Sequence, residues 1–429
     1  MKTTTITTPI SLHSHSVSEI FRAIRVRNYR LFFYGQLTSM VGTWMQSMVQ
    51  SWLVYRLTGS ALWLGVITFV MQGTAFFTSP VAGYIVDRTD RRKLLIWIEV
   101  GSMIQAFLLA ALVFTGTIRI WQLAVLSALL GVANSFESTT RHSFAFDLVG
   151  RADLSSAIGL NSVTINLSRV IGPSIAGALI ALLGTGGEGW CFVINGASFL
   201  AVIFCLALMR EEELHTHRGP KTTEAPSGFV HQLTLGLRYV QENTQIRDLL
   251  LFTTFMSFVG FPYAVIMPFI ATQTLHGGAN TLGWLTGTLG VGALFGGLSA
   301  SRPRKGTQAI WRKILSDLFF LGFSLVILGL SRSMTLSMCA ATALGFFLMG
   351  SFPLVNSTIQ TLVDDSVRGR VVSLYTMSFL GAGPLGSLVM GSLTDGIGVQ
   401  KATIGCGVFC VLSALAAFYG RRSEQAKPI

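Results

Sequence analysis

Long apolar stretches separated by short polar segments run through the whole chain. A helix needs about 20 mostly apolar residues to cross a bilayer, and the 429-residue sequence contains twelve such stretches. Their expected limits are 31–54, 61–85, 94–116, 120–143, 156–183, 189–209, 249–273, 281–301, 311–331, 335–362, 371–394 and 399–420. The pattern predicts an all-α polytopic membrane protein with twelve transmembrane helices.

The composition supports this prediction. Hydrophobic residues make up 51% of the chain and charged residues only 12%, whereas soluble proteins carry about 25% charged residues. The composition therefore argues against soluble domains. Residues 1–19 are polar and rich in Ser and Thr. Because no apolar core follows a basic region there, we expect no cleaved signal peptide.

Lys and Arg residues are concentrated in alternate loops. If both termini are cytoplasmic, all but five of the 31 basic residues lie on the cytoplasmic side. The exceptions are Arg56, Arg119, Arg332 and Lys401 on the external side and Arg169 inside a helix. Cytoplasmic loops of membrane proteins show this bias. Contact of the same loops with anionic lipids accounts for the net charge of +12, so no nucleic-acid partner is expected.

A long polar segment divides the predicted helices into two sets of six. Residues 211–228 are polar, and residues 229–247 carry an amphipathic pattern suited to a helix lying on the inner leaflet. The expected domains are a cytoplasmic tail 1–30, a six-helix bundle 31–210, a central cytoplasmic loop 211–248, a second bundle 249–420 and a tail 421–429.

Two landmarks recur in both halves. Arg92-Lys93 opens the third predicted helix and Arg312-Lys313 the ninth; Gly172-Pro173 lies in the fifth and Gly383-Pro384 in the eleventh. Landmarks at corresponding positions indicate a duplicated unit. We therefore expect two pseudo-symmetric six-helix bundles with a solute site between them, near the bilayer midplane.

A charged loop joins the second and third predicted helices. Six formal charges fall within residues 87–93, so this loop is solvated, and its four cations place it on the cytoplasmic side. The run Gly83-x-x-x-Asp87-Arg88-x-Asp90-Arg91-Arg92 resembles the signature loop of the major facilitator superfamily. Gly172-Pro173-Ser-Ile-Ala-Gly177 resembles the antiporter motif in helix 5 of its exporters.

Residues 141–177 and 356–388 are similar to the branch of that superfamily that contains the enterobactin exporter and macrolide efflux proteins. The resemblance implies alternating access coupled to proton antiport. It also implies that the signature loop joins a cytoplasmic charge network that closes the inner gate. The gating residues would be Asp87, Arg88, Arg91 and the candidate partners Arg141 and Asp147. The alternative is a solvated loop that only sets topology.

The first predicted helix carries polar residues along one face. Helical spacing aligns Gln36, Ser39, Thr43, Gln46 and Gln50. We expect this face to line an aqueous cavity whose amides bind a polar solute. The alternative is hydrogen bonding between packed helices.

Arg169 lies near the middle of the fifth predicted helix, about 20 Å along it at 1.5 Å per residue. A cation at that depth must find an anion, carbonyl groups or water. Asn166 and Ser162 share its face. Two alternatives stay open: Arg169 and Asn166 bind an anionic solute such as a carboxylate-bearing siderophore, or Arg169 is fixed to backbone carbonyls beside Gly172-Pro173.

Three acidic residues are candidates for proton coupling: Glu99, Glu137 and Asp317. Each is predicted to lie in the cytoplasmic third of a helix. There a carboxylate either carries a proton or forms an ion pair with nearby basic residues. For all three residues the ion pair is the simpler alternative.

These features predict a secondary active transporter that exports a small organic solute, a siderophore or an amphipathic drug, across a bacterial-type inner membrane by proton antiport. An importer of a small organic anion and a non-transporting scaffold or sensor are the alternatives. No enzyme motif, cofactor site or metal site is expected. The expected partners are the solute, protons and membrane lipids, and we expect a monomer with both termini in the cytoplasm.

Overall fold

The computed structural model describes residues 21–425, apart from residues 216–228, 301, 303, 305, 365 and 366. These described residues form helices and no strands. The longer helices are α2 (Arg27–Thr58), α3 (Ala61–Val86), α4 (Arg91–Phe114), α5 (Ile120–Val149), α6 (Leu154–Leu183), α7 (Gly187–Ala207), α8 (Phe229–Glu242), α9 (Thr244–Gly260), α10 (Tyr263–Phe269), α11 (Ala279–Ala300), α12 (Thr307–Leu330), α13 (Met334–Leu362), α14 (Arg368–Ile397) and α15 (Val399–Gln425). Short turns are η1 (Arg22–Arg25), η2 (Gly184–Gly186), η3 (Glu211–Glu213) and η4 (Ile270–Thr274).

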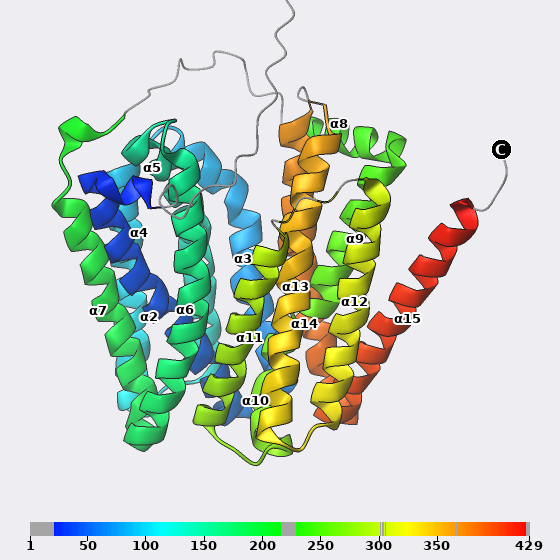
Figure 1. Ribbon diagram of the computed structural model, residues 1–429. Helices are drawn as coiled ribbons and strands as arrows, with labels where there is room; N and C mark the ends of the chain where they lie inside the picture. The colour runs from blue at the N-terminus through cyan, green and yellow to red at the C-terminus, as the bar shows by residue number, and fades with distance from the viewer. Residues whose placement is uncertain are drawn as a thin grey trace, which may run out of the picture.

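The helices form two bundles that stand side by side (Figure 1). In the N-terminal bundle α2 packs against α6 and α7, α3 against α5, and α4 against α7. In the C-terminal bundle α11 packs against α13, α12 against α15, and α9 against α14. α8 lies across one end of the C-terminal bundle (Figure 1). We call this end of the molecule the α8 end and the other end the opposite end.

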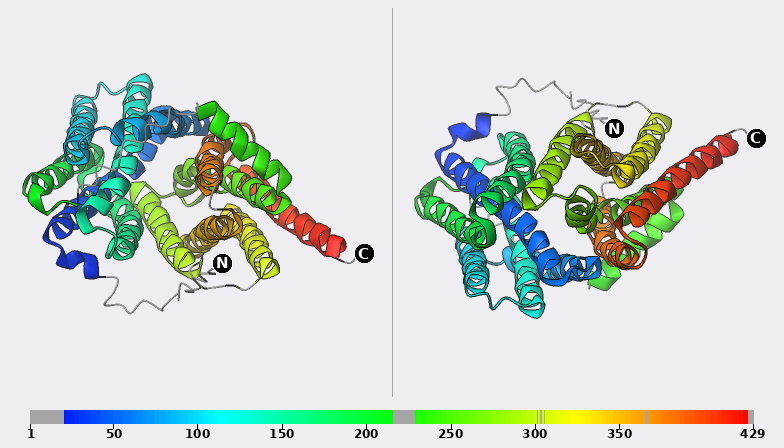
Figure 2. Two further views of the ribbon diagram at one scale, coloured as in Figure 1. Left: turned by 90° about the horizontal axis from the view of Figure 1, so that it is seen from above. Right: turned by 90° about the horizontal axis from the view of Figure 1, so that it is seen from below.

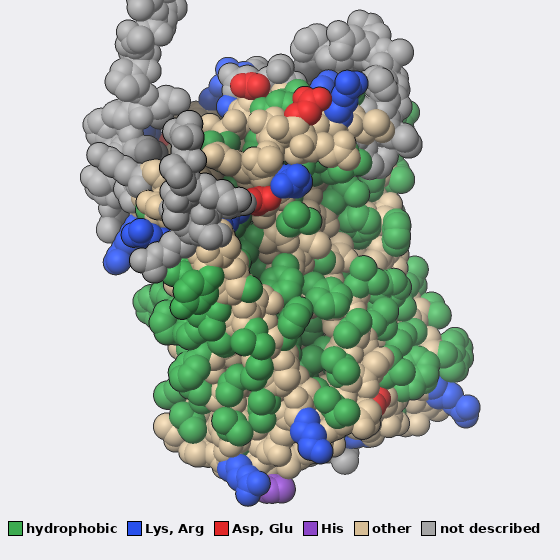
Figure 3. Space-filling view, turned by 90° about the vertical axis from the view of Figure 1, so that its right-hand side faces the viewer, with side chains coloured by type: hydrophobic (Ala, Val, Ile, Leu, Met, Phe, Trp, Pro, Cys, Tyr) green, Lys and Arg blue, Asp and Glu red, His purple; other side chains and the backbone are tan. Residues whose placement is uncertain are grey.

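Hydrophobic side chains cover the flank of the C-terminal bundle, while charged side chains gather toward its two ends (Figure 3). Large apolar side chains such as Phe323 and Leu330 on α12 and Phe409 and Leu412 on α15 are exposed. An apolar surface of this extent would be unfavourable in water. It suits the hydrocarbon core of a bilayer, which is about 30 Å thick.

Eleven helices in the described part of the chain are long and apolar enough to cross a membrane. α2, which corresponds to the first predicted span, is not among them. It has 32 residues, but its glutamines, serines and threonines make it too polar. It nevertheless packs within the N-terminal bundle between α6 and α7. The expected twelve helices are therefore eleven apolar spans and one polar helix buried among them.

The seventh predicted span is interrupted. Instead of one helix over residues 249–273, α9 ends at Gly260, α10 begins at Tyr263, and the π-helical turn η4 follows. Pro262 lies in the break, where its missing N–H removes a helical hydrogen bond. The predicted surface helix over residues 229–247 also divides: α8 ends at Glu242 and α9 begins at Thr244.

The most extensive contacts between the two bundles are made by two pairs of helices, α3 with α14 and α6 with α11. Seen along the bundle axis, these pairs lie between the two halves (Figure 2). Within the α6–α11 pair, close backbone contacts run from Gly177 beside Ala279 to Arg169 beside Gly290. Within the α3–α14 pair, Gly65 lies against Ser387. These contacts extend from near the opposite end to about the middle of the helices.

Candidate functional site

The signature loop connects α3 to α4 at the α8 end. Asp90 caps α4 by accepting a hydrogen bond from the Lys93 backbone N–H at 3.1 Å. Arg91 donates from Nη1 to both carboxylate oxygens of Asp147 on α5, at 2.8 and 2.9 Å. The Asp147 side chain is only 8% exposed, so this ion pair is well shielded from water. The structure thus brings together one gating pair that the sequence proposed.

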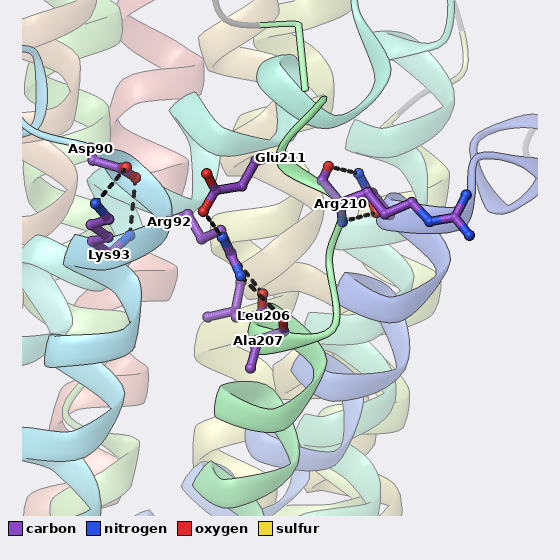
Figure 4. Close-up of polar contacts among 8 residues, drawn as sticks. Asp90, Arg92, Lys93, Leu206, Ala207, Arg210 and Glu211 are labelled. Carbon is purple, nitrogen blue, oxygen red and sulfur yellow. Dashed lines mark hydrogen bonds and ion pairs between the residues drawn. The ribbon is translucent and has the colours of Figure 1, made fainter. Parts of the chain in front are cut away.

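Arg92 extends this charge network to α7. Its Nε donates to the carbonyl of Leu206 at 2.7 Å, its Nη2 donates to the carbonyl of Ala207 at 3.2 Å, and its guanidinium pairs with Glu211 (Figure 4). The last carbonyls of a helix lack intrahelical partners, and a cation there is favourable. Arg92 is part of the signature run but is not among the predicted gating residues, because its partners lie more than one hundred residues away.

Asp87 and Arg88 stand outside this network. Arg88 lies over the ring of Tyr84, 3.6 Å from its centroid, and donates to the Tyr84 carbonyl at 3.2 Å. Asp87 is exposed at the C-terminus of α3 and makes no side-chain hydrogen bond or ion pair to another described residue. Arg141, the second proposed partner, pairs instead with Glu137 at 2.8 Å and donates to Asn161 at 2.5 Å.

The polar face of α2 points mostly into the N-terminal bundle. Gln46 donates to Gln105 on α4 at 3.1 Å and accepts from Asn195 on α7 at 2.7 Å. Gln50 donates to Ser127 on α5. The exposed fractions of Gln46 and Gln50 are 1% and 5%. For these two residues the geometry favours hydrogen bonding between packed helices over a cavity wall.

Thr43 and Gln36 lie differently on the same face of α2. The Thr43 hydroxyl donates to the Ser39 carbonyl at 3.0 Å, a bond within the helix. Gln36 lines a cavity of about 240 Å³ between α2, α5 and α6 toward the α8 end. The cavity is lined by Tyr29, Phe32, Phe33, Gln36, Arg141, His142, Ala145, Phe146, Leu154, Ala157, Ile158, Asn161 and Thr164. We call it the α2–α5–α6 cavity.

Aromatic rings and a few polar groups share the α2–α5–α6 cavity. Four aromatic side chains supply apolar and π surface, while Gln36, Arg141, His142 and Asn161 supply hydrogen-bonding groups. Mostly apolar walls with few polar groups are typical of sites that bind small organic molecules. The arrangement fits an amphipathic solute.

Glu99 lies directly behind the cavity wall. Its side chain is 2% exposed, and Gln36 donates to it from Nε2 to Oε1 across 3.5 Å, the outer limit for a hydrogen bond. No described Lys or Arg forms an ion pair with it. A buried carboxyl with one weak neutral donor is unfavourable in its charged form. The simpler ion-pair alternative therefore does not describe Glu99.

The other two acidic candidates are ion-paired. Glu137 forms the i,i+4 pair with Arg141 already described. Asp317, which is 1% exposed, pairs with Lys313 one turn earlier and accepts a hydrogen bond from Ser351 on α13 at 3.0 Å. Both arrangements match the structural alternative that the sequence left open.

Arg169 lies at the seam between the bundles. It lines a second cavity of about 70 Å³, formed by α2, α6, α10 and α11 and including Trp44, Pro173, Tyr263 and Met267. The guanidinium carbon is 4.8 Å from the centroid of the Trp44 ring, a distance at which a cation is attracted to the ring. We call this the seam cavity.

Arg169 is only partly satisfied by its surroundings. Its Nε is buried and has no hydrogen-bond partner. Asn166, expected to share its site, donates instead to the Ser162 carbonyl at 2.8 Å. None of the described carbonyls beside Gly172-Pro173 accepts a hydrogen bond from Arg169. The backbone-anchored alternative is therefore absent from this part of the structure, and a cation–π contact takes its place.

The Gly-Pro motif lets α6 approach two helices closely. A Cβ atom on Gly172 would lie 2.7 Å from the Val41 carbonyl oxygen of α2, and one on Gly177 would lie 3.0 Å from the Ala279 carbonyl oxygen of α11. The first distance is shorter than Cβ contacts in real proteins, and the second is so short that α11 would have to move by a few tenths of an ångström. The motif thus holds α6 against its own bundle at Gly172 and against the other bundle at Gly177.

The family of this chain follows from comparison with known proteins. Residues 19–426 match the family model described as transmembrane secretion effector. The chain is 27% identical to the multidrug efflux pump Tap of Mycobacterium tuberculosis, covering 90% of this chain and 92% of Tap. It is 23% identical to the staphyloferrin A transporter of Staphylococcus aureus (93% and 97% covered) and 22% identical to macrolide efflux protein A of Streptococcus pyogenes (91% and 96%).

Solved structures agree on the fold. A bacterial homologue of the human lysosomal transporter Spinster, in an inward-facing and occupied conformation, superposes with a TM-score of 0.71 at 15% identity, over 94% of this chain and 97% of that one. The nucleoside transporter NupG gives a TM-score of 0.71 at 12% identity, over 91% and 98%. With a family match over nearly its whole length, the chain belongs to the transmembrane secretion effector family of the major facilitator superfamily of membrane transporters.

Proposed function

We propose that this transporter is a secondary active exporter of a siderophore or an amphipathic drug across the bacterial inner membrane. The arrangement of the bundles carries the proposal. They touch at the opposite end, where Asp395 of α14 bonds to the start of α3, while Asp87 at the α8 end is unpaired among the described residues. If the basic loops face the cytoplasm, this is the inward-facing state of an alternating-access cycle.

The names of the relatives support export of an organic solute. Tap is named as a multidrug efflux pump, and the Streptococcus pyogenes relative as a macrolide efflux protein. The Staphylococcus aureus relative is named as a staphyloferrin A transporter. A solute of this kind would enter from the α8 end and place its apolar part among the aromatic residues of the α2–α5–α6 cavity.

Arg169 would bind an acidic group of the solute in the seam cavity. Its guanidinium contacts the Trp44 ring, and no described residue accepts a hydrogen bond from its Nε, so this donor is unused. A carboxylate is the natural partner of such a guanidinium. Because the seam cavity is built from both bundles, a solute there would be sensitive to their relative position. Asn166, Thr43, Gln46 and Gln50 would then support the site through helix packing rather than through contact.

Glu99 is the best-placed proton carrier among the three acidic residues. Gln36 contacts it from the cavity wall, so a solute that hydrogen-bonds to Gln36 would change the one hydrogen bond that the described residues make to the carboxyl. Glu137 and Asp317 already have cationic partners, which leaves them no comparable need to take up a proton. The Gln36 side-chain amide would thus contact both the solute and the proton-carrying carboxyl.

Inside-out membrane vesicles test the direction and the coupling together. The probes are a citrate-type carboxylate siderophore and a cationic dye, added outside vesicles whose lumen is acidic. An antiporting exporter accumulates at least one probe in the lumen, and a protonophore abolishes the accumulation. Gradient-driven loss of preloaded probe would instead identify an importer. If vesicles that contain the folded protein showed no flux with any solute tested, the protein would be a scaffold or sensor and not a transporter.

A further inference from the structure

Asp395, in the last turn of α14, lies at the start of α3 in the other bundle. Its Oδ1 accepts a hydrogen bond from the Ala61 backbone N–H at 2.7 Å. Its Oδ2 accepts one from the Leu62 N–H at 3.1 Å and one from the Ser60 hydroxyl at 2.5 Å. One carboxylate therefore receives three hydrogen bonds from a chain segment more than 330 residues away.

These bonds complete the N-terminal cap of α3. The first N–H groups of a helix have no intrahelical acceptor. Here Ser60 accepts from the Trp63 N–H at 3.4 Å, while Asp395 takes the N–H groups of Ala61 and Leu62. The positive end of the α3 dipole also attracts the carboxylate. Residues of both bundles are thus needed to satisfy the start of α3.

Asp395 gains nothing comparable from its own helix. It lies two residues before the end of α14, where the helix dipole is negative and an anion is unfavourable. Its stabilising partners belong to the N-terminal bundle. Gly391, one turn earlier, lies against the backbone of Ala61 and Leu62, so the helices touch closely beside the carboxylate. Separation of the bundles at this end would break all three hydrogen bonds.

Asp87 occupies the corresponding position at the other end of the same helix pair. It follows the last residue of α3, again at the negative end of a dipole. α3 and α14 run antiparallel, so α14 begins at the α8 end, with Val367 at its N-cap position. The stretches Ala61–Asp87 and Arg368–Asp395 are nearly equal in length.

We propose that Asp395 is a latch that holds the transporter closed at the opposite end. It is the counterpart of the inner gate that the family resemblance assigns to Asp87: when the bundles rock, Asp395 releases the start of α3 as the gate at Asp87 closes. Each carboxylate therefore stabilises one of the two states. The inference rests on the alternating access proposed above, but it does not depend on the identity of the solute.

Distances between spin labels at the opposite end test this latch in the full-length protein. Arg119 on the N-terminal bundle and Arg332 on the C-terminal bundle are both exposed in loops there. The labels are attached through Arg119→Cys and Arg332→Cys, in a protein whose five native cysteines have been replaced. Electron–electron resonance in proteoliposomes then gives the populations with short and long separations, without any solute.

We expect Asp395→Ala to lower the ratio of short to long separations about 2- to 30-fold, which corresponds to the range of free energies lost when a helix cap is removed. Ser60→Ala should shift the ratio in the same direction by less. Asp395→Asn, which keeps one acceptor oxygen, should be intermediate. Asp87→Ala should shift the ratio the opposite way. The control Asp248→Ala breaks an ion pair with Arg421 inside the C-terminal bundle and should leave the ratio unchanged.

Two results would overturn the latch. If wild type samples both separations but Asp395→Ala leaves their ratio unchanged, Asp395 is not a latch, and alternating access still stands. If wild type gives a single separation that no variant alters, the rocking motion is absent, and the proposed transport mechanism fails with the latch. The Ser60→Ala and Asp395→Ala effects should also be non-additive, since the two side chains share a bond.

Discussion

Gln36 and Glu99 meet at the boundary between a cavity and the protein interior. The Gln36 Nε2 atom is 3.5 Å from the Glu99 Oε1 atom, and Gln36 also lines the α2–α5–α6 cavity. The buried carboxyl is thus one side chain away from space that a solute can occupy. This relationship connects the proposed proton site with the proposed solute site, which the sequence had placed on separate helices.

Glu99→Gln should uncouple transport from the proton gradient. A pH difference of one unit supplies about 1.4 kcal/mol per coupled proton, or about a tenfold concentration ratio. The variant should lose that factor in gradient-driven accumulation within inside-out vesicles. Exchange of labelled for unlabelled solute should continue, because it needs no net proton movement. The exposed Glu242→Gln serves as the control, and a Glu99→Gln variant that still concentrates solute would exclude Glu99 as the carrier.

Arg169→Gln should reduce binding of carboxylate solutes selectively. Hydrogen bonds to charged groups contribute about 1.5–3 kcal/mol, so the dissociation constant of a carboxylate probe should rise about 10- to 150-fold. The neutral methyl ester of the same probe should bind equally well to both proteins. Fluorescence titration in detergent measures both constants.

Arg169→Lys separates charge from geometry at the same site. Lysine keeps the cation but cannot make two parallel hydrogen bonds to a carboxylate. We expect its affinity for the carboxylate probe to fall between those of wild type and Arg169→Gln. Equal loss of acid and ester binding in both variants would instead indicate that Arg169 supports the seam through its contact with Trp44.

Asp87→Asn should abolish export while the protein still inserts and folds. Asp87 is exposed and makes no side-chain hydrogen bond or ion pair with the rest of the described chain, so its removal costs this state little stability. Its proposed role lies in the other state. Solute flux in inside-out vesicles, together with the amount of monodisperse protein extracted from the membrane, measures the two effects. If Asp87→Asn exported solute at the wild-type rate, the signature loop would serve only to set the membrane topology.

Gln46→Leu should destabilise the N-terminal bundle without changing solute preference. The substitution leaves Gln105 and Asn195 without their shared partner. Hydrogen bonds between membrane helices contribute about 0.6 kcal/mol on average and up to about 1.7 kcal/mol, so a modest fall in the detergent melting temperature is expected. Relative affinities for several solutes should stay constant. A changed solute preference would instead indicate that Gln46 contacts the solute.

Several features followed from local sequence alone. Apolar length fixed where nearly every membrane helix lies, because crossing the hydrocarbon core requires a set number of residues whatever packs around them. The polar helix α2 and the broken span at Pro262 are the exceptions. Glu137 with Arg141 and Lys313 with Asp317 are spaced one helical turn apart, so helix geometry alone brings each pair together.

The tertiary structure decided which distant side chains meet. Gln46 could face water or Asn195, and nothing in its own helix distinguishes the two, because a polar stripe has the same spacing in either case. Arg91 finds Asp147, and Asp395 finds the start of α3, only when helices far apart in sequence are packed together. The sequence alone thus determined the helices and a candidate gate, Asp87 and Arg91. Only the packing of the two bundles identified Asp395 at the opposite end as a second candidate gate. A contact between bundles depends on their relative position and not on the residues of either helix alone.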